Sequence, residues 1–506
     1  MKPPLYISPI HAEYYSIQFH EWDDEVARIY SGRPENGARK AEIELVLGHR
    51  VELIPVPEEK IAELNRARFG VGASSVVSIG RPQTGTGTAA AGAEPVPPLP
   101  QTPSAPRLSA EPSIVRFVDR LIQEASVDRA TDIHIEPYED RVDVRYRIDG
   151  VLHHIPVPAE INELHRSVVS RLKILSHLDI AEQRLPQDGR FRFQLPNGTE
   201  LDIRISVLPT AFGEAVDLRL LTTQQVYTGL ASLGLSEADQ QTAEQILTRP
   251  HGVVLVTGPT GSGKTTTLYA FLTLLNQSDR KIITIEDPIE YQIPGITQIQ
   301  INPKIDLTFA RGLRSMLRHD PDTMMVGEIR DYETADTTIQ VALTGHLVFS
   351  TVHTNDAPAT PARLINMGVE PYLVASSLEC VIAQRLVRLI CENCRERVSA
   401  EARPIFREVA AQIERRGIPW DGHLDYGRGC EQCKGTGYRG RTAIYEILPV
   451  TEHLQSVVLE QAAASTLRAA AEEEGFRTMR YDGLCKVADK RTTYEEVLRV
   501  TRKEVY

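Results

Sequence analysis

Apolar and polar positions divide the chain into regions with different periodicities. Between 111 and 227, two stretches carry apolar residues at the spacing of one helix face, over 111–126 and 161–178. Other stretches alternate apolar and polar residues as strands do, over 132–137, 141–150, 189–196, 201–208 and 215–221. This mixture predicts an α+β domain over 111–227.

A second pattern begins at 228. Short, fully apolar runs alternate with helical segments as far as 389, which is typical of an α/β domain with a mostly parallel sheet. A cysteine-bearing insert at 390–440 and a polar, helical C-terminal region at 441–506 are expected to follow.

The segment 81–110 shows neither periodicity. Pro, Gly, Ala, Ser and Thr fill 22 of its 30 positions, and such a composition buries too little apolar surface to offset the entropy of ordering. It therefore predicts a flexible linker after an N-terminal module at 1–80. In that module, 41–54 indicates one or two strands and 58–69 an amphipathic helix.

Charge and composition exclude several classes of protein. The formal net charge of −12 argues against a protein that coats nucleic acid, which needs a basic face to neutralise phosphates. No apolar run approaches the ~18 residues of a membrane span, and the N-terminus lacks the apolar segment of a secretory signal. Six cysteines in 506 residues are too few for a disulfide scaffold.

The most specific motif lies between 253 and 266. A four-residue apolar strand precedes a loop of the form G-x-x-x-x-G-K-T, and a helix follows. Glycines let backbone N–H groups converge on phosphate oxygens, the helix N-terminus adds positive potential and the lysine adds a charge. The predicted nucleotide-binding residues are Gly258, Pro259, Thr260, Gly261, Ser262, Gly263, Lys264, Thr265 and Thr266. The Thr265 hydroxyl is the candidate ligand for Mg²⁺.

Acidic and histidine side chains flank other predicted strands of this domain. Glu328 follows one apolar run and Glu286 ends another, and acids at the carboxyl ends of parallel strands lie where ligands bind. Glu328 is a candidate to polarise a water or to hold Mg²⁺ through one. His346 and His353 stand at the two ends of the strand 347–352 and are candidates to sense or position phosphate. Solvated strand ends and structural histidines are the alternatives.

Four cysteines form two CxxC pairs with 35 residues between them. These are Cys391 with Cys394 and Cys430 with Cys433. Each pair places two thiolates on one turn, and two such turns form a tetrahedral S₄ site suited to structural Zn²⁺. A redox pair would be expected singly rather than doubled. Cys380 and Cys485 are expected to be buried or incidental thiols.

Four segments resemble, in order, the Walker A, Asp box, Walker B and His box of secretion ATPases: GPTGSGKTTTLY, ITIEDPIEY, LRHDPDTMMVGEIRD and TGHLVFSTVHTNDA. Segments before and after them extend the resemblance over about 111–500, and the set is most similar to the type II secretion ATPase family, the general secretory pathway E proteins. The resemblance implies a RecA-like P-loop NTPase domain preceded by an α+β PAS-like domain. It also implies a homo-hexamer that hydrolyses ATP with Mg²⁺ and drives pseudopilus assembly.

The same resemblance implies a place and partners. The protein would act on the cytoplasmic side of the inner membrane of a Gram-negative bacterium, beside the secretion platform. The cytoplasmic domain of a bitopic platform protein would dock onto the module at 1–80. A type IV pilus extension ATPase, a nucleic-acid translocase and a nucleotide-gated scaffold without turnover remain the alternatives.

Functional residues carry over by position. The resemblance implies that Lys264 and Thr265 contact phosphates and Mg²⁺, that Glu328 is the catalytic glutamate and that Glu286 is a supporting acid. His346 and His353 fall on the His-box positions. Arg204 and Arg219 fall on the family's phosphate-contacting arginines, and period-two alternation places both on the polar face of their strands.

Overall fold

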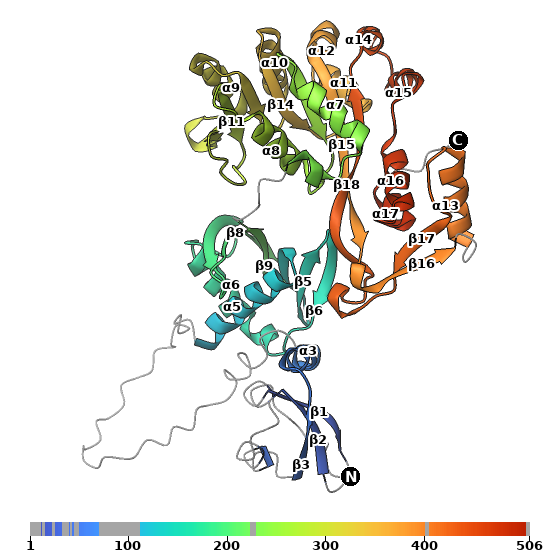
Figure 1. The fold of residues 1–506 in the computed structure, drawn as a ribbon. Coiled ribbons are helices and arrows are strands. Elements are labelled where there is room, and N and C mark those ends of the chain that lie inside the picture. The colour runs from blue at the N-terminus through green and yellow to red at the C-terminus, as the bar shows by residue number, and fades with distance from the viewer. Residues whose placement is uncertain are drawn as a thin grey trace, which may run out of the picture. The chain divides into compact units, whose positions relative to one another are not determined.

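The structure is a computed structural model. It describes residues 12, 16–22, 26–32, 40, 43–44, 50–69, 112–222, 229–399 and 404–501. The predicted linker at 81–110 lies outside these residues. The chain divides into two compact units, 1–224 and 225–506 (Figure 1).

The N-terminal part of the first unit contains a three-stranded sheet. β1 (Ile17–Trp22) pairs antiparallel with β2 (Val26–Ser31), which pairs parallel with β3 (Arg50–Pro55). The helix predicted at 58–69 is confirmed as α3 (Glu58–Phe69). The strand prediction over 41–54 is only partly right, because Ile43 and Glu44 are helical and β3 begins at Arg50.

A six-stranded antiparallel sheet forms the larger part of the first unit. Its strand order is β6-β5-β4-β9-β8-β7, and apolar residues of its strands form one core with two helices. The elements are α5 (Pro112–Val127), β4 (Ala130–Pro137), β5 (Val142–Ile148), β6 (Val151–Ile155), α6 (Ile161–Leu175), β7 (Gln187–Gln194), β8 (Glu200–Thr210) and β9 (Gly213–Thr222). Each helix and strand expected here is present. β6 was not expected, because its sequence VLHHI does not alternate.

The second unit is built on a seven-stranded sheet with the order β12-β11-β13-β14-β10-β15-β18. All neighbouring strands are parallel except β15 and β18. The strands are β10 (Gly252–Thr257), β11 (Ile282–Glu286), β12 (Thr297–Gln300), β13 (Thr323–Val326), β14 (Leu347–Val352), β15 (Leu378–Ile390) and β18 (Tyr438–Pro449). The predicted α/β architecture is confirmed.

Helices cover both faces of this sheet, so the apolar strands are buried on both sides. Val254 and Val256 of β10 pack toward α7 (Glu237–Leu247) and α8 (Lys264–Leu275). Val253 and Leu255 face the opposite core, to which α9 (Phe309–Met316), α10 (Tyr332–Leu343), α11 (Ala359–Asn366) and α12 (Pro371–Ser377) contribute.

The C-terminal part departs from prediction at one element. The region expected to be helical from 441 begins with β18, which continues through Pro449 and forms the outer strand of the sheet. Its pairing with β15 joins segments about 60 residues apart, and local periodicity does not report such a partner. The helices that follow are α14 (Glu452–Leu459), α15 (Ala464–Glu473), α16 (Met479–Ala488) and α17 (Tyr494–Val500).

The cysteine-bearing insert lies between β15 and β18. It contains the two-stranded sheet β16 (Arg395–Ser399) and β17 (His423–Gly427), with α13 (Pro404–Arg415) between them as the sequence predicts. Val409 and Ile413 of α13 are fully buried in one core with Leu484 of α16 and Val497 of α17. The insert therefore shares its core with the C-terminal helices. Across the part of the chain that is described, no helix combines the length and apolar character needed to cross a membrane.

Candidate nucleotide site and tetracysteine cluster

The loop between β10 and α8 passes close to β15. Gly258 (φ +151°) and Gly263 (φ +89°) have backbone conformations that L side chains rarely adopt. A Cβ on Gly258 would lie 2.6 Å from the carbonyl oxygen of Gln384, and one on Gly263 would lie 2.8 Å from its side-chain nitrogen. Glycine is therefore required at both ends of the loop, which leads directly into the N-terminus of a 12-residue helix. This cradle fits phosphate groups.

Lys264 bends back over this loop. Its Nζ donates to the carbonyl oxygens of Gly258 (2.8 Å) and Pro259 (3.1 Å). Burial lowers the pKa of Lys264 to about 8, although the nearby carboxylate of Glu328 acts in the opposite direction. Thr265 lies beside it in the first turn of α8, where its hydroxyl would hold Mg²⁺.

Glu328 follows β13 at the same edge of the sheet. One carboxylate oxygen lies 3.3 Å from Nε2 of His353, and the other pairs with Arg330. The carboxylate is mostly buried (14% exposed), whereas Arg330 is 64% exposed. Because β13, β14 and β10 are adjacent and parallel, their carboxyl ends bring Glu328, His353 and Lys264 to one place.

The two histidines of the His box are far apart. β14 runs parallel to β10 with Leu347 opposite Gly252 and Val352 opposite Thr257. The carbonyl oxygen of His346 accepts a hydrogen bond from Gly252 N (3.1 Å), at the amino end of the strand. At ~3.3 Å per residue of strand, about 20 Å separates His346 from His353. Only His353 lies beside the phosphate loop of its own chain.

Glu286 ends β11, and its side chain is buried rather than open to solvent. It is 3% exposed and accepts hydrogen bonds from Thr284 Oγ1 (2.6 Å), Gln298 Nε2 (3.1 Å) and the Tyr269 hydroxyl. Burial raises the pKa of Glu286, against the effect of these donors. The contacts join α8, β11 and β12, so Glu286 fixes the helix that follows the phosphate loop.

Arg204 and Arg219 lie directly opposite each other on β8 and β9. Their neighbours in each strand are buried and apolar, which confirms that both arginines project from the polar face. Nε of Arg219 donates to Asp132 (3.0 Å). On the same face, Asp202 pairs with Arg190, and Asp217 pairs with His134. The contact of these arginines with phosphates stays a prediction.

The four cysteines of the CxxC pairs converge on one point, and their sulfur atoms lie within 4.8 Å of one another. The separations are 3.8 Å for Cys391–Cys430 and Cys394–Cys433 and 3.7 Å for Cys430–Cys433. Four thiolates around one Zn²⁺ at ~2.3 Å have sulfur atoms ~3.8 Å apart, whereas a disulfide needs ~2.05 Å. The cluster fits zinc, and none of the cysteines is disulfide-bonded.

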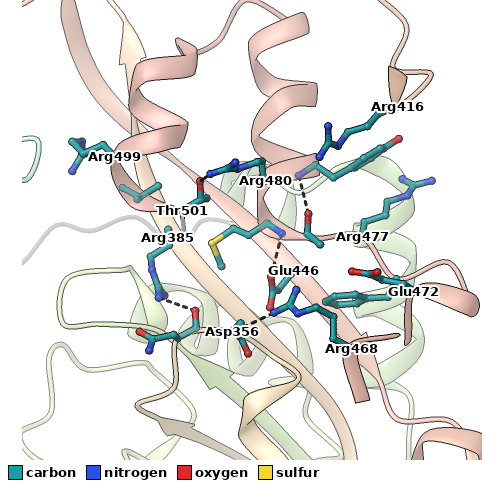
Figure 2. Close-up of a pocket in the computed structure, with 16 residues that line it drawn as sticks. Asp356, Arg385, Arg416, Glu446, Arg468, Glu472, Arg477, Arg480, Arg499 and Thr501 are labelled. Carbon is teal, nitrogen blue, oxygen red and sulfur yellow. Dashed lines mark hydrogen bonds and ion pairs between the residues drawn. The ribbon is translucent and has the colours of Figure 1, made fainter. Parts of the chain in front are cut away.

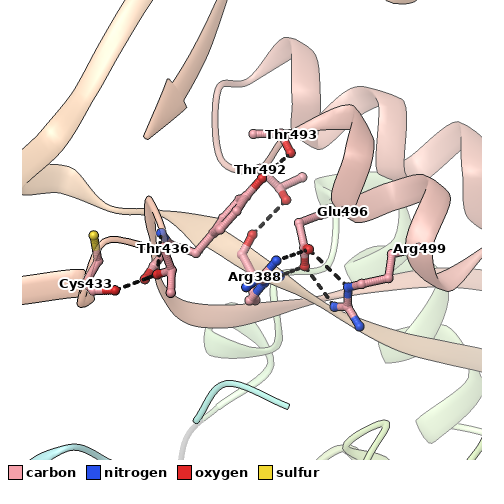
Figure 3. A network of polar contacts seen from close by, with 8 residues as sticks. Arg388, Cys433, Thr436, Thr492, Thr493, Glu496 and Arg499 are labelled. Carbon is pink, nitrogen blue, oxygen red and sulfur yellow. Dashed lines mark hydrogen bonds and ion pairs between the residues drawn. The ribbon is translucent and has the colours of Figure 1, made fainter. Parts of the chain in front are cut away.

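Polar contacts connect this cluster to the C-terminal helices (Figure 3). Thr436 Oγ1 donates to the carbonyl oxygen of Cys433 (2.6 Å), and the Tyr438 hydroxyl lies 2.7 Å from Thr493 Oγ1. Nearby, Arg388 pairs with Glu496 of α17 (2.6 Å). A metal in the cluster would hold the ends of β15 and β18 against α17, which is a structural role.

The remaining thiols show no sign of reactivity. Burial raises the pKa of both the fully buried Cys380 and the half-buried Cys485, in the latter to about 11. A raised pKa keeps a thiol protonated and poorly nucleophilic. This confirms the expectation of buried or incidental thiols.

The comparisons with known proteins agree with this geometry. Residues 108–499 match the family of Type II/IV secretion system proteins. The chain belongs to this family. It is 44% identical over 464 residues to Type II secretion system protein E of Pseudomonas aeruginosa, across 92% of this chain and 90% of the relative. It is 45% identical over 389 residues to the type IV pilus assembly ATPase PilB of Myxococcus xanthus, across 76% and 67%.

A solved structure supports the fold of this Type II/IV secretion system protein. The X-ray structure of the Legionella pneumophila ATPase DotB matches with a TM-score of 0.56 at 21% identity, over 76% of this chain and 95% of that one. At this identity the likeness concerns the fold alone.

Several residues around the nucleotide site were not predicted from the sequence. Arg330 pairs with Glu328. Its position two residues after Glu328 in the Walker B segment could have indicated this contact. Thr257, immediately before the phosphate loop, accepts from Thr354 N (2.8 Å). Gln384 accepts from Thr267 Oγ1 (2.7 Å) under the loop. The last two pairs are about 100 residues apart in the sequence, so no local pattern indicates them.

Proposed function

We propose that this chain is the ATP-hydrolysing motor of a type II secretion system. The observation that carries this proposal is the convergence of Glu328, His353 and Lys264 at the carboxyl edge of the sheet, beside the phosphate loop. A nucleotide-gated scaffold would need the loop but not a buried carboxylate aimed at the same edge. Hydrolysis of ATP accounts for both features.

Each residue has a defined task in this proposal. The amides of the phosphate loop and Lys264 bind the phosphates. The Thr265 hydroxyl would hold Mg²⁺, which would supply positive charge beside the phosphates. Glu328 accepts a proton from the water whose oxygen bonds to the γ-phosphorus, while the bond to the ADP oxygen breaks. His353 holds the Glu328 carboxylate in place through the 3.3 Å contact.

Similarity to one type II relative in the part of the chain before 108 favours type II secretion over pilus extension. The match to the type II relative extends over 92% of this chain, whereas the match to the pilus ATPase covers 76%. The additional part includes residues before 108, where the family match begins. A pilus extension ATPase is the alternative. The net charge of −12 disfavours a nucleic-acid translocase.

The finer proposals concern assembly and location. We propose a homo-hexamer at the cytoplasmic face of the inner membrane that drives pseudopilus assembly. The module at 1–80 would dock onto the cytoplasmic domain of a bitopic platform protein, with 81–110 as its tether. Arg204 and Arg219 would reach the phosphates when the first unit closes on the second. Binding of the isolated platform domain by the full chain, and its loss on deletion of 1–80, tests the docking.

The substitution Glu328→Gln tests hydrolysis. The amide keeps the shape of the side chain but does not accept the proton, so turnover should fall by ~10²–10⁴-fold while ATP still binds. Phosphate release and nucleotide affinity measure the two effects. Glu333→Gln is the matched control, because Glu333 is 63% exposed and pairs with Arg314 on the surface. Wild-type turnover in Glu328→Gln would contradict the assignment, and stimulation of turnover by DNA would favour a translocase.

A further inference from the structure

The segment 353–357, here called the β14 loop, contacts the nucleotide site with its first two residues. His353 lies against Glu328, as described above. The backbone N–H of Thr354 donates to Thr257 Oγ1 (2.8 Å), and the two threonine hydroxyls lie 2.7 Å apart. Thr257 is the last residue before Gly258. The position of the β14 loop therefore sets the position of His353 relative to both the candidate base and the phosphate loop.

The other end of the same loop contacts the C-terminal helices (Figure 2). Asp356 Oδ2 pairs with Nη2 of Arg468 on α15 at 3.1 Å. The backbone N–H of Ala357 donates to Glu446 of β18 (2.6 Å), whose second oxygen accepts from Met479 N at the start of α16 (3.1 Å). The β14 loop thus links the edge that carries Glu328 to both α15 and α16.

The two links differ in how firmly they hold. Glu446 is 3% exposed, and each of its oxygens accepts from a backbone N–H group, so breaking this contact would leave buried polar groups without partners. Asp356 and Arg468 are 24% and 32% exposed, and a partly solvated ion pair opens at small cost. Arg468 is therefore the adjustable link between α15 and the loop.

The space around the Asp356–Arg468 ion pair allows α15 to move relative to the β14 loop. Asp356, Glu446 and Arg468 line a pocket of about 960 Å³ together with residues of α16 and α17. If this region were closely packed, a shift of α15 would displace every segment that contacts it. At this pocket, the ion pair joins α15 directly to the β14 loop.

We propose that Arg468 is a positioning residue for hydrolysis. Through Asp356 it holds the β14 loop so that His353 keeps Glu328 directed at the phosphate loop. A displacement of the C-terminal helices then changes the rate of turnover. This proposal rests on the proposed function, in which Glu328 is the base.

The test compares Arg468→Ala with Arg499→Ala in the full chain. Arg499 lines the same pocket, but it pairs with Glu496 of its own helix (2.8 Å). Arg468→Ala should lower kcat by about 2- to 5-fold with little change in KM for ATP, and Arg468→Lys should recover part of the loss. Asp356→Asn removes the charge but keeps an oxygen that can accept from Ala359 N (3.0 Å). Its combination with Arg468→Ala should lower kcat no further than either change alone.

A second measurement needs no turnover. Hydrogen exchange of the Thr354 and Ala357 amides, without nucleotide, should be faster in Arg468→Ala than in Arg499→Ala. The proposal is overturned if Arg468→Ala and Arg499→Ala have the same kcat and the same exchange rates. It is also overturned if the separate losses in kcat of Asp356→Asn and Arg468→Ala multiply in the double variant. If the wild-type chain does not hydrolyse ATP, the proposed function fails, and the exchange rates still decide whether Arg468 holds the loop.

Discussion

At the scale of single residues, Lys264 shows how burial and charge oppose each other at the nucleotide site. Its ammonium donates to two loop carbonyls, and burial lowers its pKa to about 8. The side chain is charged below this pH and loses its charge as the pH rises through it. Since phosphates bind the charged form, bound nucleotide raises this pKa again, and affinity is linked to pH.

Nucleotide affinity should therefore fall as the pH is raised from 7 to 9. The decline above pH 8 should approach but not exceed about tenfold per pH unit, because one proton is involved. Titration calorimetry with the full chain at a series of pH values measures it. Lys264→Arg stays charged over this range, so it should remove most of the slope. An identical slope in both proteins would show that another group titrates.

At the scale of elements, the tetracysteine cluster explains how an insert between two strands is kept in place. The cluster lies where the paired strands β15 and β18 meet the insert. Within the insert, α13 packs into one core with α16 and α17. Backbone N–H groups of Cys430 (3.1 Å) and Gly437 (3.2 Å) donate to the Cys433 sulfur, which stabilises a thiolate. The insert and the C-terminal helices should therefore lose stability together when metal is removed.

Purified protein should contain about one zinc per chain, and Cys430→Ser should lose it. Structural zinc binds with an apparent ~10–16 kcal/mol, so the variant should unfold at lower temperature and be cleaved by protease within the insert. Metal analysis and thermal unfolding measure these effects. Cys485→Ser is the control, since Cys485 lies outside the cluster. A metal-free wild type, or a disulfide between the pairs, would contradict this prediction.

At the scale of the whole molecule, the proposed mechanism requires the first unit to supply Arg204 and Arg219 to the site in the second. The two arginines are adjacent on neighbouring strands, so they can act on one ligand together. Arginine suits this task because its planar fork binds two phosphate oxygens and stays charged. Arg219 would exchange its 3.0 Å contact with Asp132 for a phosphate.

Arg204→Ala and Arg219→Ala should fold and assemble, yet hydrolyse ATP far more slowly. An arginine that meets transition-state charge contributes on the order of 10³–10⁵ in rate, and lysine should restore little because it lacks the fork. Phosphate release and oligomer size measure the outcome. Arg192→Ala is the control, with a guanidinium that is 72% exposed on the next strand. Near wild-type rates in both alanine variants would mean that the arginines form surface ion pairs only.

The sequence by itself determined what depends on neighbours along the chain. The strand, glycine loop and helix at 252–275 follow from local spacing, and each CxxC pair brings two thiols together on one turn. Alternation alone placed Arg204 and Arg219 on a polar face. These features need no distant partner, so their patterns are complete within a few residues.

Only the tertiary structure decided which of these features lie together. The parallel order of β13, β14 and β10 brings His353 together with Glu328 and the phosphate loop. The pairing of β15 with β18 makes the start of an expected helical region the outer strand of the sheet. Residues of α8 and β12 surround Glu286, and Asp356 pairs with Arg468 of α15. These contacts depend on the order of the strands and on which side chains are buried. Both result from packing between segments that are far apart in the sequence, and local periodicity does not indicate which distant segments will pack together.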